Sequence, residues 1–195
     1  MVNVDGVILA AGLSSRMGSV NKVQSVLAGR TLLEHAVTKL MPQVDMLVVN
    51  GDKNLCGDGA IADHLEGFKG PLVGLYSALL SDKLSSAQYL MMAPCDGPFI
   101  PENLVAALYR EISATDADIA CVRYQNFAQP TFSLWHKRVA PMVEQALLIK
   151  KNGGFKPLLE GLNSVYLDWP EQVINPFFNI NTQDDLAEAE RLLCL

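Results

Sequence analysis

The sequence predicts an α/β protein with three layers, in which a mostly parallel, mixed sheet lies between helices. Short apolar runs typical of strands alternate along the chain with amphipathic stretches typical of helices, and this order favours a parallel sheet. The apolar runs are continuous rather than alternating, which fits strands that are buried on both faces. No repeat or linker-like segment interrupts the pattern, so we expect one domain over residues 1–195.

The region up to residue 122 alternates between strand and helix. Apolar runs predict strands at 5–11, 45–50, 88–93 and 118–122. Helices are expected between them at 31–41, 71–80 and 101–112. The apolar residues of the first helix recur with helical spacing until Pro42, and Pro71 suits the first turn of the second.

The pattern is looser after residue 123. We expect strands at 130–135, 164–168 and 177–180, and helices at 138–151 and 182–193. Thr182 is a suitable N-cap for the last helix, and Asp185 comes close to completing a capping box. Ligands of open α/β sheets bind beyond the carboxyl ends of the strands. We therefore expect the functional site in the segments that follow the first three strands and the last one.

The composition argues against several classes of function. The chain carries 15 Lys and Arg against 21 Asp and Glu, and this acidic balance argues against nucleic-acid binding. No stretch has the pattern of a signal peptide or of a membrane helix, so we expect a cytoplasmic protein without a membrane partner. The 4 cysteines lack CxxC spacing, which predicts reduced, mostly buried thiols and no structural zinc site.

A small, cationic loop follows the first expected strand. In "VILAAGLSSRMGSVNK", residues 7–22, the apolar run ends at Gly12, and small residues lead on to Arg16 and Lys22. Small residues let backbone N–H groups approach an anion, and the two cations add charge, so the loop suits phosphate groups. A tight turn with two solvated cations would explain the same residues. The segment has neither the P-loop nor the dinucleotide-binding pattern.

An aspartate follows the third expected strand, in "MMAPCDGPFIP", residues 91–101. Phosphate groups often bind together with a metal ion, and proteins hold Mg²⁺ through one or two carboxylates plus phosphate oxygens and water. Asp96 should share a sheet edge with Lys22, so it is a candidate ligand, although a turn or cap role would also explain it. We expect Cys95 to be a small buried residue rather than a nucleophile.

Several segments together resemble a known family. The first loop is similar to the signature "LAAG-x-S-x-RMG-x-x-x-K" of nucleotidyltransferases. The segments "PCDGPFIP", "GPLVGL", "QPTFSLW" and "NINTQDDL" resemble the molybdenum cofactor guanylyltransferase family, so the likeness spans nearly the whole chain. It implies a Rossmann-like nucleotidyltransferase fold. It also implies transfer of GMP from GTP to the terminal phosphate of molybdopterin, with release of pyrophosphate and with Mg²⁺ as cofactor.

The resemblance also implies roles for individual residues. Arg16, Lys22 and Asp96 would be catalytic, and Asp96 would bind the metal. The residues that bind GTP would be Leu9, Ala10, Ala11, Gly12, Lys22, Asn50, Asp63 and Asp96. Asn179 and Asn181 would face the nucleotide or the acceptor. From the residues alone, Asn50 fits an Asn-Gly turn equally well, and "NINT" fits a strand end followed by a helix cap.

Other functions remain open at this point. The nearer alternatives are a cytidylyltransferase for the same cofactor and a sugar-phosphate nucleotidyltransferase, and "GPLVGL" counts against both. A non-catalytic nucleotide-binding protein is an alternative of another class. It need not retain a metal carboxylate, so the joint presence of Arg16, Lys22 and Asp96 favours an enzyme. The implied partners are GTP and molybdopterin, with transient contacts to other proteins of cofactor biosynthesis.

Overall fold

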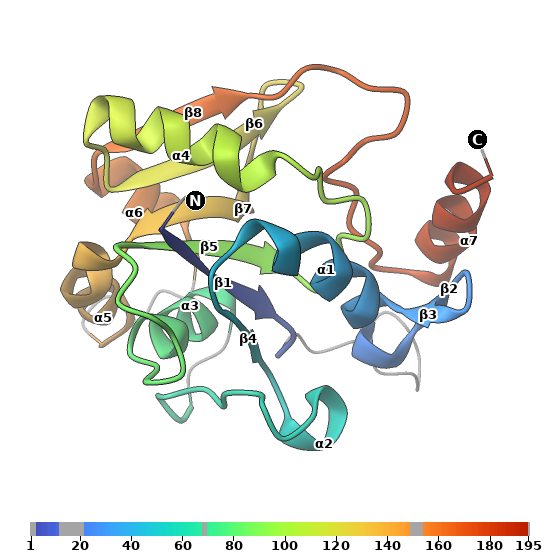
Figure 1. The fold of residues 1–195 in the computed structure, drawn as a ribbon, viewed down its shortest axis with the longest axis horizontal. Helices are drawn as coiled ribbons and strands as arrows, with labels where there is room; N and C mark the ends of the chain where they lie inside the picture. The colour runs from blue at the N-terminus through green and yellow to red at the C-terminus, as the bar shows by residue number, and fades with distance from the viewer. Residues whose placement is uncertain (1–2, 12–21, 68–69, 149–153, 195) are drawn as a thin grey trace.

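A six-stranded sheet forms the centre of the structure, which is a computed structural model describing residues 3–11, 22–67, 70–148 and 154–194 (Figure 1). The strands are β1 (Val4–Leu9), β4 (Leu47–Asn50), β5 (Tyr89–Pro94), β6 (Ile119–Tyr124), β7 (Phe127–His136) and β8 (Ser164–Asp168). Their order is β4-β1-β5-β7-β6-β8. Only β7 pairs antiparallel within this sheet, with β5 and β6, so the predicted mostly parallel, mixed sheet is confirmed.

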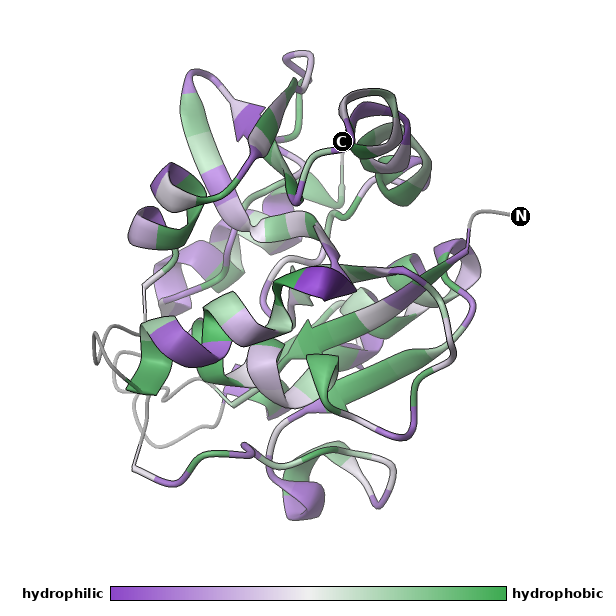
Figure 2. Ribbon diagram, turned by 90° about the vertical axis from the view of Figure 1, so that its left-hand side faces the viewer, coloured by the Kyte–Doolittle hydropathy of each residue, from purple (hydrophilic) through white to green (hydrophobic). Residues whose placement is uncertain are grey.

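Helices cover both faces of this sheet (Figure 1). One face carries α1 (Leu32–Leu40) and α4 (Leu104–Thr115). The other carries α3 (Pro71–Leu79), α5 (Ala140–Leu148) and α6 (Lys156–Gly161). Met91 and Ala93 of β5 belong to the first core, and Leu90 and Met92 belong to the second. Both faces of β5 are therefore hydrophobic, and Figure 2 shows hydrophobic residues along the strands in the middle of the sheet.

Shorter elements complete the described structure. They are the hairpin of β2 (Val26–Leu27) and β3 (Arg30–Thr31), α2 (Lys53–Cys56), α7 (Gln183–Leu192), and the 3₁₀ helices η1 (Lys22–Gln24), η2 (Met41–Gln43) and η3 (Lys137–Val139). The sequence pattern did not predict β2, β3, α2 and α6, because such short elements show no measurable periodicity. None of the helices in the described ranges is long and apolar enough to cross a membrane.

Most expected elements are present, with different ends. The first strand stops at Leu9, so Ala10 and Ala11 belong to the loop that follows it. The helix expected at 101–112 begins at Leu104 and continues to Thr115. The helix expected at 138–151 begins at Ala140, and its last expected residues lie outside the described ranges.

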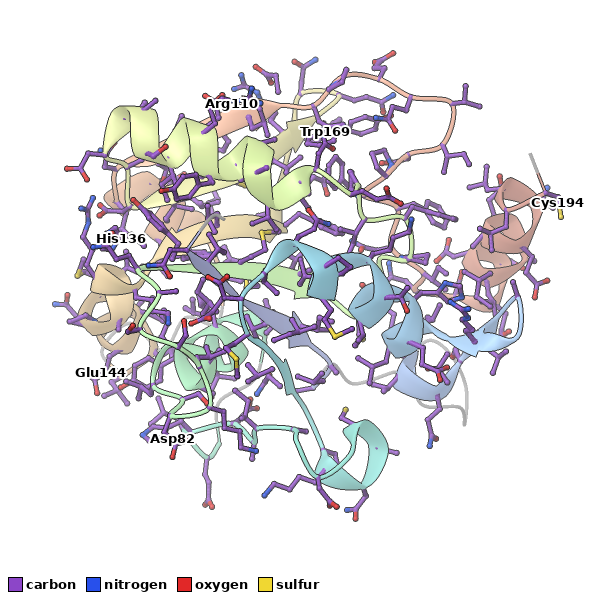
Figure 3. All side chains as sticks on the ribbon, viewed as in Figure 1. Asp82, Arg110, His136, Glu144, Trp169 and Cys194 are labelled. Carbon is purple, nitrogen blue, oxygen red and sulfur yellow. The ribbon has the colours of Figure 1, made fainter. Side chains whose placement is uncertain are left out.

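The strand expected at 177–180 is wrong. The segment pairs with no strand of the sheet. Asn175 turns the chain, because its Oδ1 accepts from the Phe177 N–H over 2.9 Å. Phe177 packs edge-on against Tyr124, Phe132 and Trp169, the last of which is labelled in Figure 3. The apolar run correctly indicated that residues of this segment are buried, but they are buried by side-chain packing and not as part of a paired strand.

A buried tyrosine connects two helices on the second face. Tyr76 of α3 is 4% exposed, and its hydroxyl donates to Oε1 of Glu144 on α5 over 2.7 Å. Glu144 is labelled in Figure 3. Burial, together with the nearby Glu144 carboxylate, raises the pKa of Tyr76 to about 12. Both causes disfavour the phenolate, so Tyr76 remains a hydrogen-bond donor at neutral pH.

We predict that Tyr76→Phe lowers the free energy of unfolding by about 1 kcal/mol near neutral pH, the usual value of one such hydrogen bond. The folded pKa of about 12 lies above the ordinary value of 10.0, so this contribution is complete below pH 10 and is lost as the pH rises toward 12. Urea unfolding should show the difference between wild type and variant shrinking at alkaline pH. The exposed Tyr166 provides the control, and a difference that stays constant with pH would contradict the prediction.

Candidate functional site

Three strand ends meet at the carboxyl edge of the sheet. β1 lies between β4 and β5, and its backbone bonds continue beyond the paired residues. The Ala10 N–H donates to the Asn50 carbonyl over 2.8 Å, and the Cys95 N–H donates to the Leu9 carbonyl over 3.0 Å. These bonds bring the loops after β1, β4 and β5 to one place.

A lysine and an aspartate from two of these loops form an ion pair. The Lys22 ammonium contacts Oδ2 of Asp96, and it also donates to Oδ1 of Asn181 over 2.7 Å. The side chains of Lys22 and Asp96 are only 14% and 15% exposed, so water screens their charges weakly. The structure therefore brings together Lys22, which lies between β1 and β2, Asp96, which follows β5, and Asn181, which precedes α7.

The loop after β5 depends on a glycine. A Cβ atom at Gly97 would lie 2.7 Å from Cζ of Phe132, closer than real Cβ contacts allow. The Asp96 carbonyl in turn accepts from the Ile180 N–H over 3.0 Å. Gly97 thus lets the loop lie against Phe132, and the Ile180 bond fixes the 177–181 segment beside Asp96.

Two buried oxygen atoms next to this loop lack a hydrogen-bond partner among the described residues. Within the described ranges, Oδ1 of Asp96 and Oδ1 of Asn179 have no hydrogen-bond partner. Burying such an acceptor without a partner is costly, so both atoms suit a ligand or cation. No group of three or more His, Cys, Asp or Glu side chains suited to a metal occurs in the described residues. An ion at Asp96 would thus need further ligands from phosphate or water, which suits Mg²⁺.

A second polar group lies at the end of β4. Asn50 is 1% exposed, and its amide donates to Oδ1 of Asp63 over 2.9 Å and to the Ile61 carbonyl over 3.3 Å. A Cβ atom at Gly74 of α3 would collide with Oδ1 of Asn50 and would lie 2.8 Å from Cδ2 of Leu9. Gly74 therefore provides the space for Asn50, a role that "GPLVGL" could have suggested but that only packing identifies.

Cys95 has the properties of a core residue. It is 5% exposed, and burial raises the pKa of its thiol to about 12, with a smaller contribution from the neighbouring Asp96 charge. A thiol with such a pKa carries almost no thiolate at neutral pH and is a poor nucleophile.

The remaining expected site residues fall into three groups. Asn179 and Asn181 lie beside Asp96, as described above, and the contact between Asn181 and Lys22 was not foreseen from the sequence. Leu9, Ala10 and Ala11 lie at the end of β1. Gly12 and Arg16 fall outside the described residues.

The chain is similar in sequence to proteins named for one activity. It matches the MobA-like NTP transferase domain family over residues 6–165. It is 35% identical over 199 residues to a molybdenum cofactor guanylyltransferase from Bradyrhizobium sp. (strain ORS 278), covering 98% of this chain and 94% of that one. A molybdenum cofactor guanylyltransferase from Rhodopseudomonas palustris (strain BisB5) is also 35% identical, with coverage of 95% and 92%.

Solved structures agree with this relationship. The molybdopterin-guanine dinucleotide biosynthesis protein A from Archaeoglobus fulgidus superposes with a TM-score of 0.80 at 25% identity, covering 97% of this chain and 98% of that one. A CMP:2-keto-3-deoxy-manno-octonic acid synthetase solved with CTP has a TM-score of 0.73 at 14% identity, covers 98% of both chains, and shares the fold alone. The family match over residues 6–165 and the full-length relatives at 35% identity show that this chain belongs to the MobA-like NTP transferase domain family.

Proposed function

We propose that this nucleotidyltransferase transfers GMP from GTP to the terminal phosphate of molybdopterin, with or without molybdenum. The products are the guanine dinucleotide form of the cofactor and pyrophosphate. The observation that carries the proposal is the meeting of Lys22 and Asp96 at the carboxyl edge of the sheet. The full-length similarity to molybdenum cofactor guanylyltransferases supports the choice of nucleotide and acceptor.

The proposed reaction is an exchange of one phosphate bond for another. An oxygen of the acceptor phosphate attacks the α-phosphorus of GTP, and the bond from that phosphorus to the bridging oxygen breaks. The electron pair of that bond leaves with pyrophosphate. Because the attacking phosphate is already anionic at neutral pH, no general base is needed. The protein would act by positioning two anions and by neutralising their charge.

Charged residues of the site have complementary proposed roles. Lys22 would contact the triphosphate and neutralise the charge that grows on pyrophosphate, and we assign the same role to Arg16. Asp96 would hold Mg²⁺, since its buried Oδ1 is a hard anionic oxygen without a partner in the described residues. When bound there, the ion would act as a Lewis acid toward phosphate oxygens.

The nucleotide would lie across the three strand ends. Leu9, Ala10, Ala11 and Gly12 would offer backbone contacts to it. At the end of β4, Asp63 would accept hydrogen bonds from N1–H and N2–H of guanine, because a carboxylate held by Asn50 through one oxygen still has acceptor capacity. Asn179 and Asn181 would face the acceptor, on the other side of Asp96. The domain over 1–195 and transient contacts with other proteins of cofactor biosynthesis belong to the same proposal.

We predict that Lys22→Ala and Asp96→Ala each lower the rate of pyrophosphate formation from GTP and molybdopterin by about 100-fold or more, the usual effect of removing one such charge-stabilising group. The measurement is a pyrophosphate release assay, with circular dichroism to confirm folding. Lys39→Ala is the matched control, since it breaks an exposed pair, Lys39 with Glu102 at 3.1 Å, away from the strand ends. Near-normal turnover in either site variant would refute the assignment.

We predict that GTP with Mg²⁺ stabilises the protein against heat more than CTP, ATP or UTP does. A ligand at about 100 times its dissociation constant adds roughly 2.7 kcal/mol to the stability. Asp63→Ala should reduce the preference for GTP, because it removes the proposed acceptor for N1–H and N2–H. A larger shift with CTP would favour the cytidylyltransferase alternative. Stabilisation by no nucleotide would contradict the nucleotide site itself.

We predict that Gly74→Ala weakens GTP binding about tenfold, a loss of about 1.4 kcal/mol. The new Cβ atom would displace Asn50 and with it the support of Asp63. Isothermal titration with GTP measures the effect. Gly161→Ala is the control, because a Cβ atom at the end of α6 meets nothing within 4 Å. Equal affinities of the two variants would show that the position of Asn50 does not matter for GTP.

A further inference from the structure

Two helices of this chain begin with the same cap. At α1, Oγ1 of Thr31 accepts from the Glu34 N–H over 3.2 Å, and Oε2 of Glu34 accepts from the Thr31 N–H over 2.7 Å. At α7, Oγ1 of Thr182 accepts from the Asp185 N–H over 3.1 Å, and Oδ2 of Asp185 accepts from the Thr182 N–H over 2.8 Å. Both are complete capping boxes, so both helices receive the same local stabilisation.

The box at α7 makes one additional bond. Oδ2 of Asp185 also accepts from the Asn181 N–H over 2.8 Å, so one carboxylate oxygen holds two successive backbone groups. At α1, the Glu34 carboxylate accepts from the backbone of Thr31 and from its hydroxyl over 2.9 Å, and both donors belong to the N-cap residue. Capping therefore explains the bond to Thr182, but it does not explain the bond to Asn181.

The bond from Asn181 to Asp185 lies next to the Lys22 contact of the candidate site. Asn181 presents Oδ1 to the Lys22 ammonium over 2.7 Å, while its amide nitrogen donates to the Asn179 carbonyl over 3.2 Å. Burial alone would raise the pKa of Asp185, but the backbone bonds from Asn181 and Thr182 and the charge of Lys22 lower it below its ordinary value. Asp185 is therefore ionised, and the charge of Lys22 stabilises its carboxylate.

The segment that carries Asn181 is anchored on both sides. Before Asn181, Ile180 is fully buried in a cluster with Leu27, Leu32 and Ala189, and its N–H donates to the Asp96 carbonyl over 3.0 Å. After Asn181, Asp185 holds the backbone through the first turn of α7. A short stretch fixed at both ends leaves the Asn181 side chain little freedom to turn away from Lys22.

We propose that Asp185 is a positioning residue for nucleotide binding, because it fixes the backbone of Asn181 and thereby directs the Asn181 amide at Lys22. This inference rests on the proposed function, in which Lys22 contacts the triphosphate. The start of α7 then influences Lys22, which is distant in sequence: the Asp185 carboxylate holds the Asn181 backbone, and the Asn181 side chain orients the Lys22 ammonium group. Asp185 itself does not contact the nucleotide.

Replacing Asp185 by glutamate separates the two roles. Glutamate at the same position of α1 satisfies the cap without bonding the preceding residue, as Glu34 shows. In Asp185→Glu the cap should therefore remain and the bond to Asn181 should be lost. We expect the variant to melt close to wild type but to bind GTP with Mg²⁺ about five- to tenfold more weakly. This is less than the loss for removing a charged hydrogen bond altogether, because the Asn181 side chain remains present.

Four further variants complete the experiment, in which titration calorimetry gives the GTP dissociation constant and thermal unfolding gives the stability. Asp185→Ala should have a lower melting temperature and a lower affinity for GTP than wild type. Glu34→Ala, the matched cap deletion at α1, should have a lower melting temperature but bind GTP as tightly as wild type. Lys22→Met should weaken GTP binding by about 100-fold, and adding Asp185→Glu to it should cause little further loss, because no ammonium remains to be oriented.

The results separate the failure of this inference from that of the proposed function. Wild-type affinity in Asp185→Glu, with Lys22→Met still impaired, would show that Asp185 is a helix cap only. A full additional loss when Asp185→Glu is combined with Lys22→Met would also overturn the inference, because Asp185 would then act independently of Lys22. Wild-type affinity in Lys22→Met would overturn the proposed role of Lys22 and this inference with it.

Discussion

Parallel pairing of β1 with both β4 and β5 is the constraint on which the site depends. A strand that is paired on both sides and covered on both faces is largely apolar, and Val4, Val7 and Ile8 are fully buried. The exception is the buried Asp5, whose carboxylate forms an ion pair with Lys137 over 2.7 Å. Parallel neighbours end at the same edge, so their following loops necessarily meet there. The bonds from Ala10 to Asn50 and from Cys95 to Leu9 extend this order into the loops. Chemistry is thereby confined to the carboxyl ends of three strands.

The site combines opposite charges with limited access to water. Lys22 and Asp96 neutralise each other in the structure, and each is also the group that we propose for a phosphate or a metal ion. Because the two charges pair with each other, neither is left uncompensated at this sheltered position. Asn181 and Asp185 extend the same network to α7. The last helix thus supports the site as well as covering the β2–β3 hairpin.

Sequence patterns predicted the elements whose signals are local. α1, α3 and α7 carry caps or an initial proline, and β8 occupies the expected residues 164–168. The prediction of a strand at 177–180 failed for a physical reason, since an apolar run shows that side chains are buried but not which groups the backbone bonds to. The strands β2 and β3 have 2 residues each and α2 has 4, too few for a periodic pattern. Local propensity therefore carries too little information to identify them.

The sequence by itself determined the class of fold, the order of its main strands along the chain and the chemical groups in the loops that follow them. It also indicated Lys22, Asp96, Asn50 and Asp63 as residues of interest, because each stands in a motif that can be recognised within a few neighbours. Only the tertiary structure decided which of these groups touch. Lys22 and Asn181 are 159 positions apart, and the space for Asn50 comes from Gly74 on a different element. Such contacts depend on how helices pack against the sheet, and that packing is a property of the whole chain.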